Sequence, residues 1–149
     1  MSQVPSGGAD RGPAESDERG SAECVAEALE AALRARAPGV YASTPIVRQL
    51  APRVGRELGL DAQIQTLLDV AVRLRDVGMV ALPDTVVLAT APLSPADWEL
   101  VNRHPVIGAQ LLEELSAVAS AAQIVRSHHE RWDAGCFPSD LTAATSRAA

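Results

Sequence analysis

The sequence of 149 residues contains no lysine, because all 13 of its basic residues are arginine. This absence excludes any mechanism that needs a lysine base, a Schiff base or the ammonium group of a phosphate-binding loop. Aromatic residues make up only 3% of the chain and apolar residues 47%, which predicts an aliphatic, alanine-rich core rather than a β-sandwich. No signal peptide is visible, and no apolar run approaches the 18 residues of a membrane span.

Basic charge, thiols and imidazoles are also scarce. The net charge of −6 disfavours DNA, RNA or a membrane as an electrostatic partner. Cys24 and Cys136 lie far apart and neither belongs to a CxxC pair, which predicts a reducing, cytoplasmic location without a disulfide framework or a zinc ribbon. Imidazole chemistry is restricted to the only three histidines, which are His104, His128 and His129.

The chain is expected to form one all-α domain, a compact bundle of about six helices over residues 21–141. Residues 1–20 are rich in glycine, proline, serine and charge and are expected to be a disordered tail, and residues 142–149 a flexible one. Apolar periodicity and capping residues predict helices at residues 22–36, 43–58, 61–75, 95–103, 105–115 and 117–130.

Proline, glycine and capping residues set the expected boundaries of these helices. Asp61 and Ser94 are typical N-caps, and Gly59 is a typical helix stop. Pro52 is expected to kink or locally disrupt the second helix. The segment 77–92 contains a glycine and two prolines and is expected to be a non-helical connection.

Four short segments carry residues suited to chemistry, and each has an ordinary structural explanation. Asp76 at a helix end opposes the helix dipole, and the adjacent Arg75 could simply offset that charge. His104, next to a proline at a helix junction, could be structural, and the pair His128 and His129 could be a solvated helix end. The segments are RDVGM (75–79), HPVIG (104–108), HHE (128–130) and CFP (136–138).

In order and spacing, these segments resemble the HD-GYP family, metal-dependent phosphohydrolases of the HD superfamily that hydrolyse cyclic di-GMP. The resemblance covers residues 28–141 and implies the all-α HD-domain bundle. It also implies a cluster of metal ions held by histidines and carboxylates, which activates water against a phosphodiester. The matching stretches are VRLRDVGMVALPD (72–84), LSPADWELVNRHPVIGAQLL (93–112) and IVRSHHERWDAGCFPSDL (124–141).

The resemblance implies four metal ligands in this chain, namely Asp76, His104, His128 and His129. In the family these positions surround one ion of the cluster. Three imidazoles and one carboxylate suit a single divalent ion such as Fe²⁺, Mn²⁺ or Zn²⁺. The alternative is that the histidines are merely tolerated in a polar cleft and hold no metal.

Other family positions are replaced. Ser43 and Arg75 stand where the family has histidine ligands, and Met79 stands where it has the lysine that assists at the phosphate. A further aspartate ligand of the family lies on a helix beyond the point where this sequence stops. The replacements predict a broken binuclear centre, in which Arg75 places a permanent cation near the vacated metal position.

Two further groups of residues surround the implied site. Glu130 and Asp133 could orient the histidines as carboxylate partners, or they could belong to a solvated helix end. The loop that gives the family part of its name, implied to help in recognising substrate and partners, is represented here by Cys136, Phe137 and Pro138.

From the resemblance we expect a regulatory or binding module in cyclic di-GMP-type signalling, with little or no hydrolysis. Its ligand would be a cyclic dinucleotide, a metal ion or a partner protein. A first alternative is a residual phosphohydrolase with one metal ion. A second is a non-catalytic interaction module similar to the HDOD relatives. Without the family's C-terminal helix, an apolar face is expected to be uncovered, and a homodimer contact or a partner helix would cover it.

Overall fold

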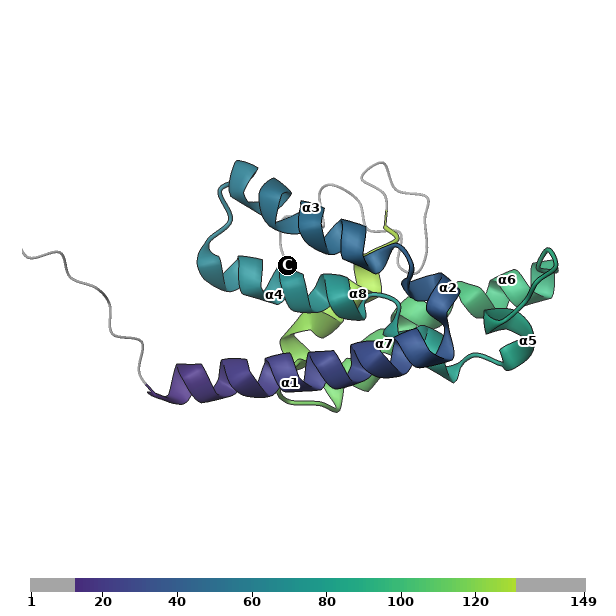
Figure 1. Ribbon diagram of the computed structural model, residues 1–149, viewed down its shortest axis with the longest axis horizontal. Helices are drawn as coiled ribbons and strands as arrows, with labels where there is room; N and C mark the ends of the chain where they lie inside the picture. The colour runs from purple at the N-terminus through teal and green to yellow at the C-terminus, as the bar shows by residue number, and fades with distance from the viewer. Residues whose placement is uncertain (1–12, 131–149) are drawn as a thin grey trace, which may run out of the picture.

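The computed structural model describes the backbone of residues 13–130 and the side chains of residues 20–130. This part of the chain is helical and contains no β-strand (Figure 1). Its six longer helices lie where the sequence predicts them, so the all-α bundle is confirmed. They are α1 (Pro13–Arg36), α3 (Thr44–Glu57), α4 (Ala62–Leu74), α6 (Pro95–Val101), α7 (His104–Glu113) and α8 (Ala122–Ser127).

Short helical turns join the longer helices. They are α2 (Pro38–Tyr41), α5 (Asp84–Val87) and the two 3-10 helices η1 (Val77–Ala81) and η2 (Ala119–Ala121). The expectation of a non-helical connection over residues 77–92 is therefore wrong where η1 and α5 form. Single turns are unstable in isolation, but Val77, Met79 and Val86 bury their side chains in the core, and this burial stabilises them.

Two helices differ in their bounds from the sequence-based expectation, and a third contains a proline. Helix α1 begins at Pro13, so residues 13–20 of the expected tail are helical; residues 1–12 and 131–149 lie outside the described part of the chain. Helix α3 continues through Pro52, so the proline does not end the helix, and the expected kink stays a prediction. The last predicted helix, 117–130, is reduced to η2 and α8, which ends at Ser127.

The predicted capping residues act as expected at two helices. The side chain of Asp61 accepts a hydrogen bond of 2.8 Å from the backbone N–H of Ile64 at the start of α4. Ser94 and Asp97 form a reciprocal capping box at the start of α6. Gly59 has a φ of 71°, a left-handed conformation that favours glycine, and it separates α3 from α4.

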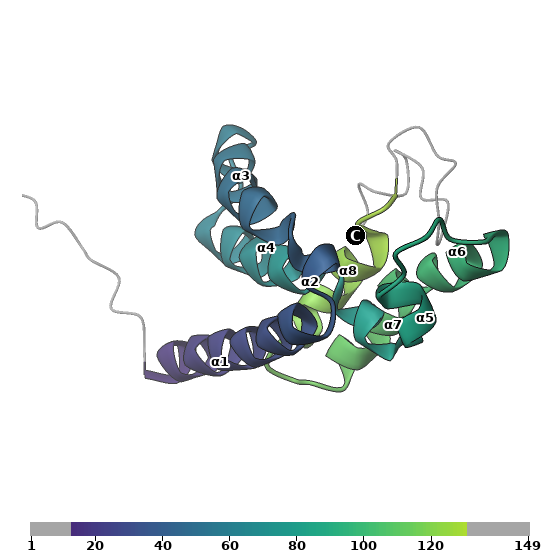
Figure 2. The same cartoon turned by 45° about the vertical axis from the view of Figure 1, so that its right-hand side comes forward.

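The core consists of two apolar clusters. The first joins α1, α4, α7 and α8 around residues such as Leu74, Leu112 and Val125. The second joins the C-terminal part of α1 to η1 and α5 around Leu33 and Met79. Helix α3 packs mainly on α4, and the two form a hairpin that projects from the rest of the bundle (Figure 2). Among the described residues, no helix is both long and apolar enough to cross a bilayer.

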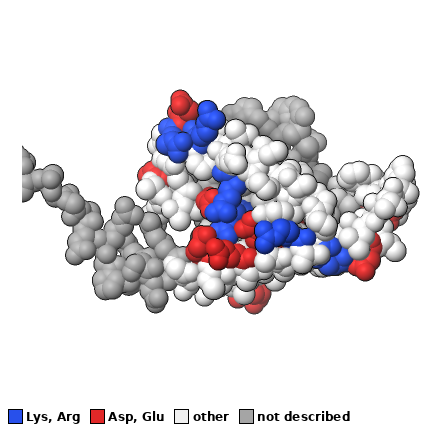
Figure 3. Space-filling view, in the orientation of Figure 1, with Lys and Arg blue, Asp and Glu red and all other residues white. Residues whose placement is uncertain are grey.

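A buried ion pair ties α4 to α1. The guanidinium of Arg73 is almost fully buried and donates hydrogen bonds of 2.7 Å to Glu30 and to Glu23. Tyr41 also donates to Glu30, and Arg48 of α3 pairs with Asp69 of α4. Acidic and basic side chains therefore gather where α1 borders α4, as Figure 3 shows. This network holds α4, whose C-terminal end leads into the candidate site, in a defined position on α1.

Candidate metal centre

Four chemically competent side chains converge from three separate parts of the chain. Asp76 lies between α4 and η1, His104 begins α7, and His128 and His129 follow directly on α8. Each of the four offers one ligand atom, and these atoms all lie within 4.8 Å of one another. The structure thus brings together the four residues that the sequence resemblance singles out. His104 is buried, Asp76 and His128 are half-buried, and His129 is exposed at the edge of the cluster.

Two glycines allow Asp76 and His104 to approach each other. A Cβ atom on Gly78 would lie 2.1 Å from the carbonyl oxygen of His104 and 2.6 Å from the backbone nitrogen of Gly108. No side chain fits there, so η1 and α7 meet backbone to backbone. Gly78 follows Asp76 by two residues, and Gly108 lies one helical turn after His104. This contact, which sequence reasoning missed, sets the separation of the two ligands; the glycines inside the RDVGM and HPVIG segments were its only signal.

Backbone carbonyls orient two of the imidazoles. The Nδ1–H of His104 donates to the carbonyl of Val101, and the Nδ1–H of His128 donates to that of Val125, each over 2.7 Å. A carbonyl can only accept, so the proton of each neutral ring lies on Nδ1 and the lone pair lies on Nε2. The two Nε2 atoms are 3.4 Å apart and lie 3.5 and 3.8 Å from Oδ1 of Asp76. The tautomers are therefore those of metal-ligating histidines.

The protonation states also suit metal binding. Burial lowers the pKa of His128 to about 4, and burial together with the charge of His104 lowers the pKa of His129. Burial alone would raise the pKa of Asp76, but the contact with His104 and the charge of Arg75 outweigh it and keep this pKa below its usual range. Near neutral pH the cluster therefore holds a carboxylate and unprotonated imidazoles at His128 and His129, the forms that bind metal.

The arrangement of these four side chains fits a cation. The Nε2 atoms of His104 and His128 face each other over 3.4 Å, and Oδ1 of Asp76 lies beside both of them. One ligand atom from each of the four residues lies within 4.8 Å of the others, so a single divalent ion could contact all four. The set of three nitrogens and one oxygen suits Fe²⁺, Mn²⁺ or Zn²⁺. The residues present therefore fit a single ion.

Arg75 occupies the other side of Asp76. Its Nε lies 3.0 Å from Oδ2 of Asp76, while Oδ1 of the same carboxylate faces His104 and His128. Its Nη2–H donates to Oγ of Ser43 over 2.7 Å. Ser43 precedes α3 with a helical backbone, and its side chain does not cap the helix; its hydroxyl accepts from Arg75. Arg75 and Ser43 are the two positions at which the resemblance implies histidine ligands, and here their side chains are hydrogen-bonded to each other.

The remaining predicted site residues fall outside the cluster or outside the described residues. Met79 is buried in the apolar cluster with Leu33 and Leu82, so its side chain is part of the core. Glu130 follows the histidine pair, and its backbone N–H donates to the carbonyl of Ser127 over 2.9 Å. Its role in orienting the histidines stays a prediction. The structure does not describe the other predicted residues, namely Asp133, Cys136, Phe137 and Pro138.

Comparison with known proteins points in the same direction. The model of a family described as HD domain matches residues 27–145. The chain is 31% identical over 100 residues to a cyclic di-GMP phosphodiesterase of Thermotoga maritima, a match that covers 66% of this chain and 27% of that protein. It is also 31% identical over 115 residues to the cyclic di-GMP phosphodiesterase response regulator RpfG of Xanthomonas campestris, covering 76% of this chain and 30% of that protein.

A third relative differs in the substrate that its name states. The chain is 29% identical over 119 residues to the 3'3'-cGAMP-specific phosphodiesterase 2 of Vibrio cholerae, a match that covers 78% of this chain and 22% of that protein. The matched region thus spans less than a third of the length of each of these relatives.

Proposed function

The chain belongs to the HD domain family, and we propose that it is a regulatory domain that holds one divalent metal ion and binds a cyclic dinucleotide with little or no hydrolysis. Three relatives support the ligand class, because their names describe phosphodiesterases that act on cyclic di-GMP or on 3'3'-cGAMP. The cluster of three histidines and Asp76 supports the metal.

The metal would be held by Asp76, His104, His128 and His129. A divalent ion bound there supplies Lewis-acid chemistry toward a phosphoryl oxygen. The protein contributes the orientation of its ligands, because the carbonyls of Val101 and Val125 fix the rings of His104 and His128. His129 closes the exposed side of the cluster.

The ion pair between Arg75 and Asp76 is the observation that carries the proposal of weak or absent hydrolysis. Two-metal phosphodiester hydrolysis uses a pair of ions about 4 Å apart, bridged by shared ligands. Here Oδ2 of Asp76 is paired with a guanidinium, a cation that cannot coordinate metal. Ser43 offers a hydroxyl that already accepts from Arg75. Within the part of the chain that the structure describes, Arg75 and Ser43 therefore put a guanidinium and a hydroxyl where the resemblance implies imidazole ligands of a second ion.

The experiment that tests this function combines metal analysis with binding and turnover. Purified protein is reconstituted with Mn²⁺, Fe²⁺ or Zn²⁺, and we expect about one ion per chain. Calorimetry with cyclic di-GMP and with 3'3'-cGAMP is expected to show binding, while chromatography of the same mixtures shows little linear product. Hydrolysis of cyclic di-GMP that Asp76→Ala abolishes would contradict the regulatory function. Such a result would support the alternative, a phosphohydrolase with one metal ion, which the intact set of four ligands favours.

An interaction module, similar to the HDOD relatives, is the second alternative, and one surface favours it. Ile46, Leu50, Val54 and Leu58 recur at every fourth position of α3 and the residue that follows it, and each side chain is at least half exposed. This apolar row lies on the hairpin that projects from the bundle. We propose that a second copy of the chain covers it, since a row on one helix can pack against its own symmetry mate in an antiparallel dimer. Measurement of the mass in solution tests this.

A further inference from the structure

Arg75 is held in place by one ion pair and two hydrogen bonds. Besides Asp76 and Ser43, the carbonyl of Val72 accepts from its Nη1–H over 3.2 Å. The side chain is only 14% exposed, so the guanidinium cannot swing freely into solvent. An arginine fixed in this way has already lost most of the rotamer freedom that binding a ligand would otherwise cost.

The guanidinium still has donors to offer. It carries five N–H groups; each terminal nitrogen uses one of its two in a hydrogen bond, and Nε forms the ion pair with Asp76. Within residues 20–130, one N–H on Nη1 and one on Nη2 have no partner. Two terminal N–H groups of a planar guanidinium match two oxygens of a phosphate group, which is the bidentate geometry that lysine cannot reproduce.

The two terminal N–H groups of Arg75 belong to a side chain that contacts Asp76, one of the four candidate metal ligands. Arg75 contacts Oδ2 of Asp76, and Oδ1 of the same carboxylate lies 3.5 Å from Nε2 of His104. A phosphodiester that reached the metal ligands would therefore come within the range of the guanidinium. Asp76 repels an anion, but the paired arginine already offsets its charge, and a divalent ion would make the site net positive.

We propose that Arg75 is the phosphate-binding residue of this site, and that its two terminal N–H groups bind non-bridging oxygens of the phosphodiester beside the metal ligands. Met79, at the family position of the phosphate-assisting lysine, is buried in the core and leaves that role to another cation. The proposal rests on the proposed function for the identity of the ligand, a cyclic dinucleotide, and on the geometry of Arg75 for the residue.

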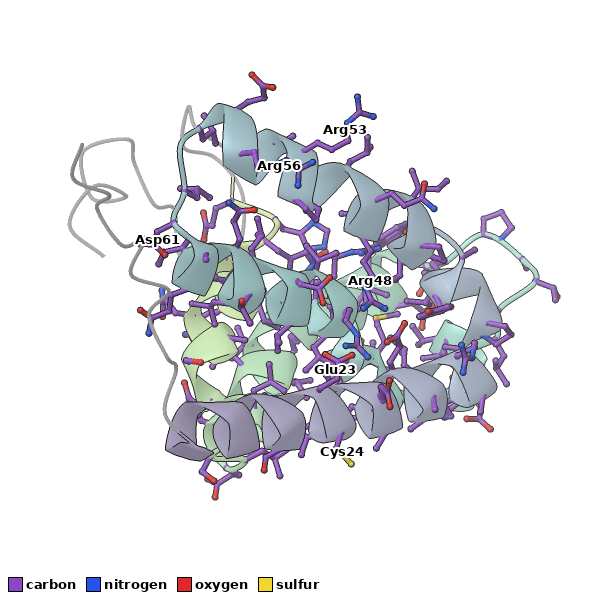
Figure 4. All side chains as sticks on the ribbon, turned by 60° about the vertical axis from the view of Figure 1, so that its left-hand side comes forward. Glu23, Cys24, Arg48, Arg53, Arg56 and Asp61 are labelled. Atoms are coloured by element: carbon purple, nitrogen blue, oxygen red, sulfur yellow. The ribbon has the colours of Figure 1, made fainter. Side chains whose placement is uncertain are left out.

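Calorimetry on zinc-loaded protein tests the proposal, with cyclic di-GMP, inorganic phosphate and guanosine as probes. We compare Arg75→Met, which removes charge and donors, with Arg75→Lys, which keeps the charge and the ion pair but loses the planar pair of donors. Arg53→Met is the matched control, because it removes the same charge from the side of α3 that faces away from α4 (Figure 4). Zinc content and circular dichroism are measured for each variant, since releasing Asp76 could alter metal binding.

The expected result is that Arg75→Met weakens cyclic di-GMP binding by 10- to 100-fold, roughly the loss of a charge-assisted pair of hydrogen bonds. Arg75→Lys should lie between this variant and wild type, and Arg53→Met should equal wild type. Guanosine, which lacks phosphate, should show no difference among the proteins. If Arg75→Met fails to fold, the affinities of Arg75→Lys and wild type for cyclic di-GMP are compared instead, and Arg75→Lys should bind more weakly.

Equal affinity of wild type and the folded Arg75 variants for cyclic di-GMP would overturn the proposal and leave the proposed function standing. If neither wild type nor any variant binds cyclic di-GMP, the proposed function fails. The titration with inorganic phosphate then tests whether Arg75 binds an anion. Phosphate binding that weakens in the Arg75 variants would support Arg75 as the anion-binding residue. Phosphate binding that is absent, or equal in all proteins, would overturn it.

Discussion

The Nε2 atoms of His104 and His128 lie 3.4 Å apart and face each other, although α7 and α8 bring them from positions 24 residues apart in the chain. Each ring is fixed by a hydrogen bond from its Nδ1–H to the carbonyl three residues earlier. Both histidines lie at a helix terminus, and the same hydrogen bond to the preceding turn orients each ring. Their Nε2 atoms therefore face the same point. Asp76 completes that point with its Oδ1 atom.

This geometry predicts a graded effect of removing ligands on metal affinity. His104→Gln and His128→Gln are expected to lower the affinity for Zn²⁺ or Mn²⁺ by at least about 100-fold, because each removes an oriented ligand of the cluster. His129→Gln should have a smaller effect, because His129 is exposed and water can replace it. Competition with a chromophoric chelator measures these affinities.

Glu113→Gln is the control for metal binding, because it changes an exposed carboxylate on α7 outside the cluster. Its affinity should equal that of wild type. A wild-type protein that stays metal-free after reconstitution would contradict the metal centre altogether.

Gly78→Ala is expected to reduce both stability and metal affinity. The new Cβ would overlap the backbone of His104 and Gly108, and backbone atoms cannot move aside as a side chain can. We expect a loss of about 3 kcal/mol in the free energy of unfolding. Metal affinity should fall by at least about tenfold, because η1 and α7 must separate and carry Asp76 and His104 apart. Urea denaturation and a metal titration measure the two effects.

Gly20→Ala provides the matched control for Gly78→Ala. Gly20 lies within α1, and nothing lies within 4 Å of the added Cβ. The substitution should stabilise the protein by about 0.5–1 kcal/mol, since alanine favours a helix over glycine. If Gly78→Ala behaved like Gly20→Ala, the backbone contact would not be what sets the ligand spacing.

The buried carboxylate of Glu30 makes part of the stability depend on pH. Burial would raise its pKa, but hydrogen bonds from Tyr41 and Arg73 outweigh burial and hold the pKa below the ordinary value of 4.5. The unfolded chain therefore takes up the proton more readily than the folded chain. The stabilisation is fully present above about pH 4.5 and is lost as the pH falls through the folded-state pKa.

Glu30→Gln tests this coupling. We expect a loss of about 2–4 kcal/mol near pH 7, because Arg73 stays buried with one of its two close carboxylate partners removed. The difference from wild type should shrink as the pH falls below 4.5, where wild type also becomes protonated. Chemical denaturation between pH 3 and pH 7 measures both effects, and Glu27→Gln on the exposed side of α1 is the control. A difference that is constant over this range would contradict the role of Glu30.

The exposed apolar row on α3 predicts association that depends on concentration. Leu50→Glu places a charge in the middle of the row and should weaken a dimer by at least about tenfold, because the charge would lose water on association. Sedimentation equilibrium measures the dissociation constant. Gln49→Glu, which adds the same charge at an exposed neighbouring position outside the row, is the control. Wild-type protein that stays monomeric at millimolar concentration would contradict the second copy as the occupant.

Four residues of the candidate site could be predicted because the order and spacing of their segments resemble the HD-GYP family. With three histidines in the chain, a cluster that includes all of them required only that the HPVIG and HHE segments meet the RDVGM segment. The N-caps at Asp61 and Ser94 were also predictable, because an N-cap is a local interaction within one helical turn. The start of α1 at Pro13 could not be predicted, because residues 13–20 are polar and show little of the apolar periodicity that marks a helix.

Composition and local spacing by themselves determined that this chain is an all-α domain and that it lacks lysine chemistry, and the resemblance to the HD-GYP family predicted the four candidate metal ligands. Only the tertiary structure decided how the charge of Asp76 is divided, with one oxygen facing two imidazoles and the other paired with Arg75. It also decided that Gly78 and Gly108 let two backbones touch and that Met79 belongs to the core. The physical reason is range: caps and helices depend on neighbours within a few residues, whereas the sharing of one carboxylate depends on helices that are distant in sequence and meet only when the core has packed.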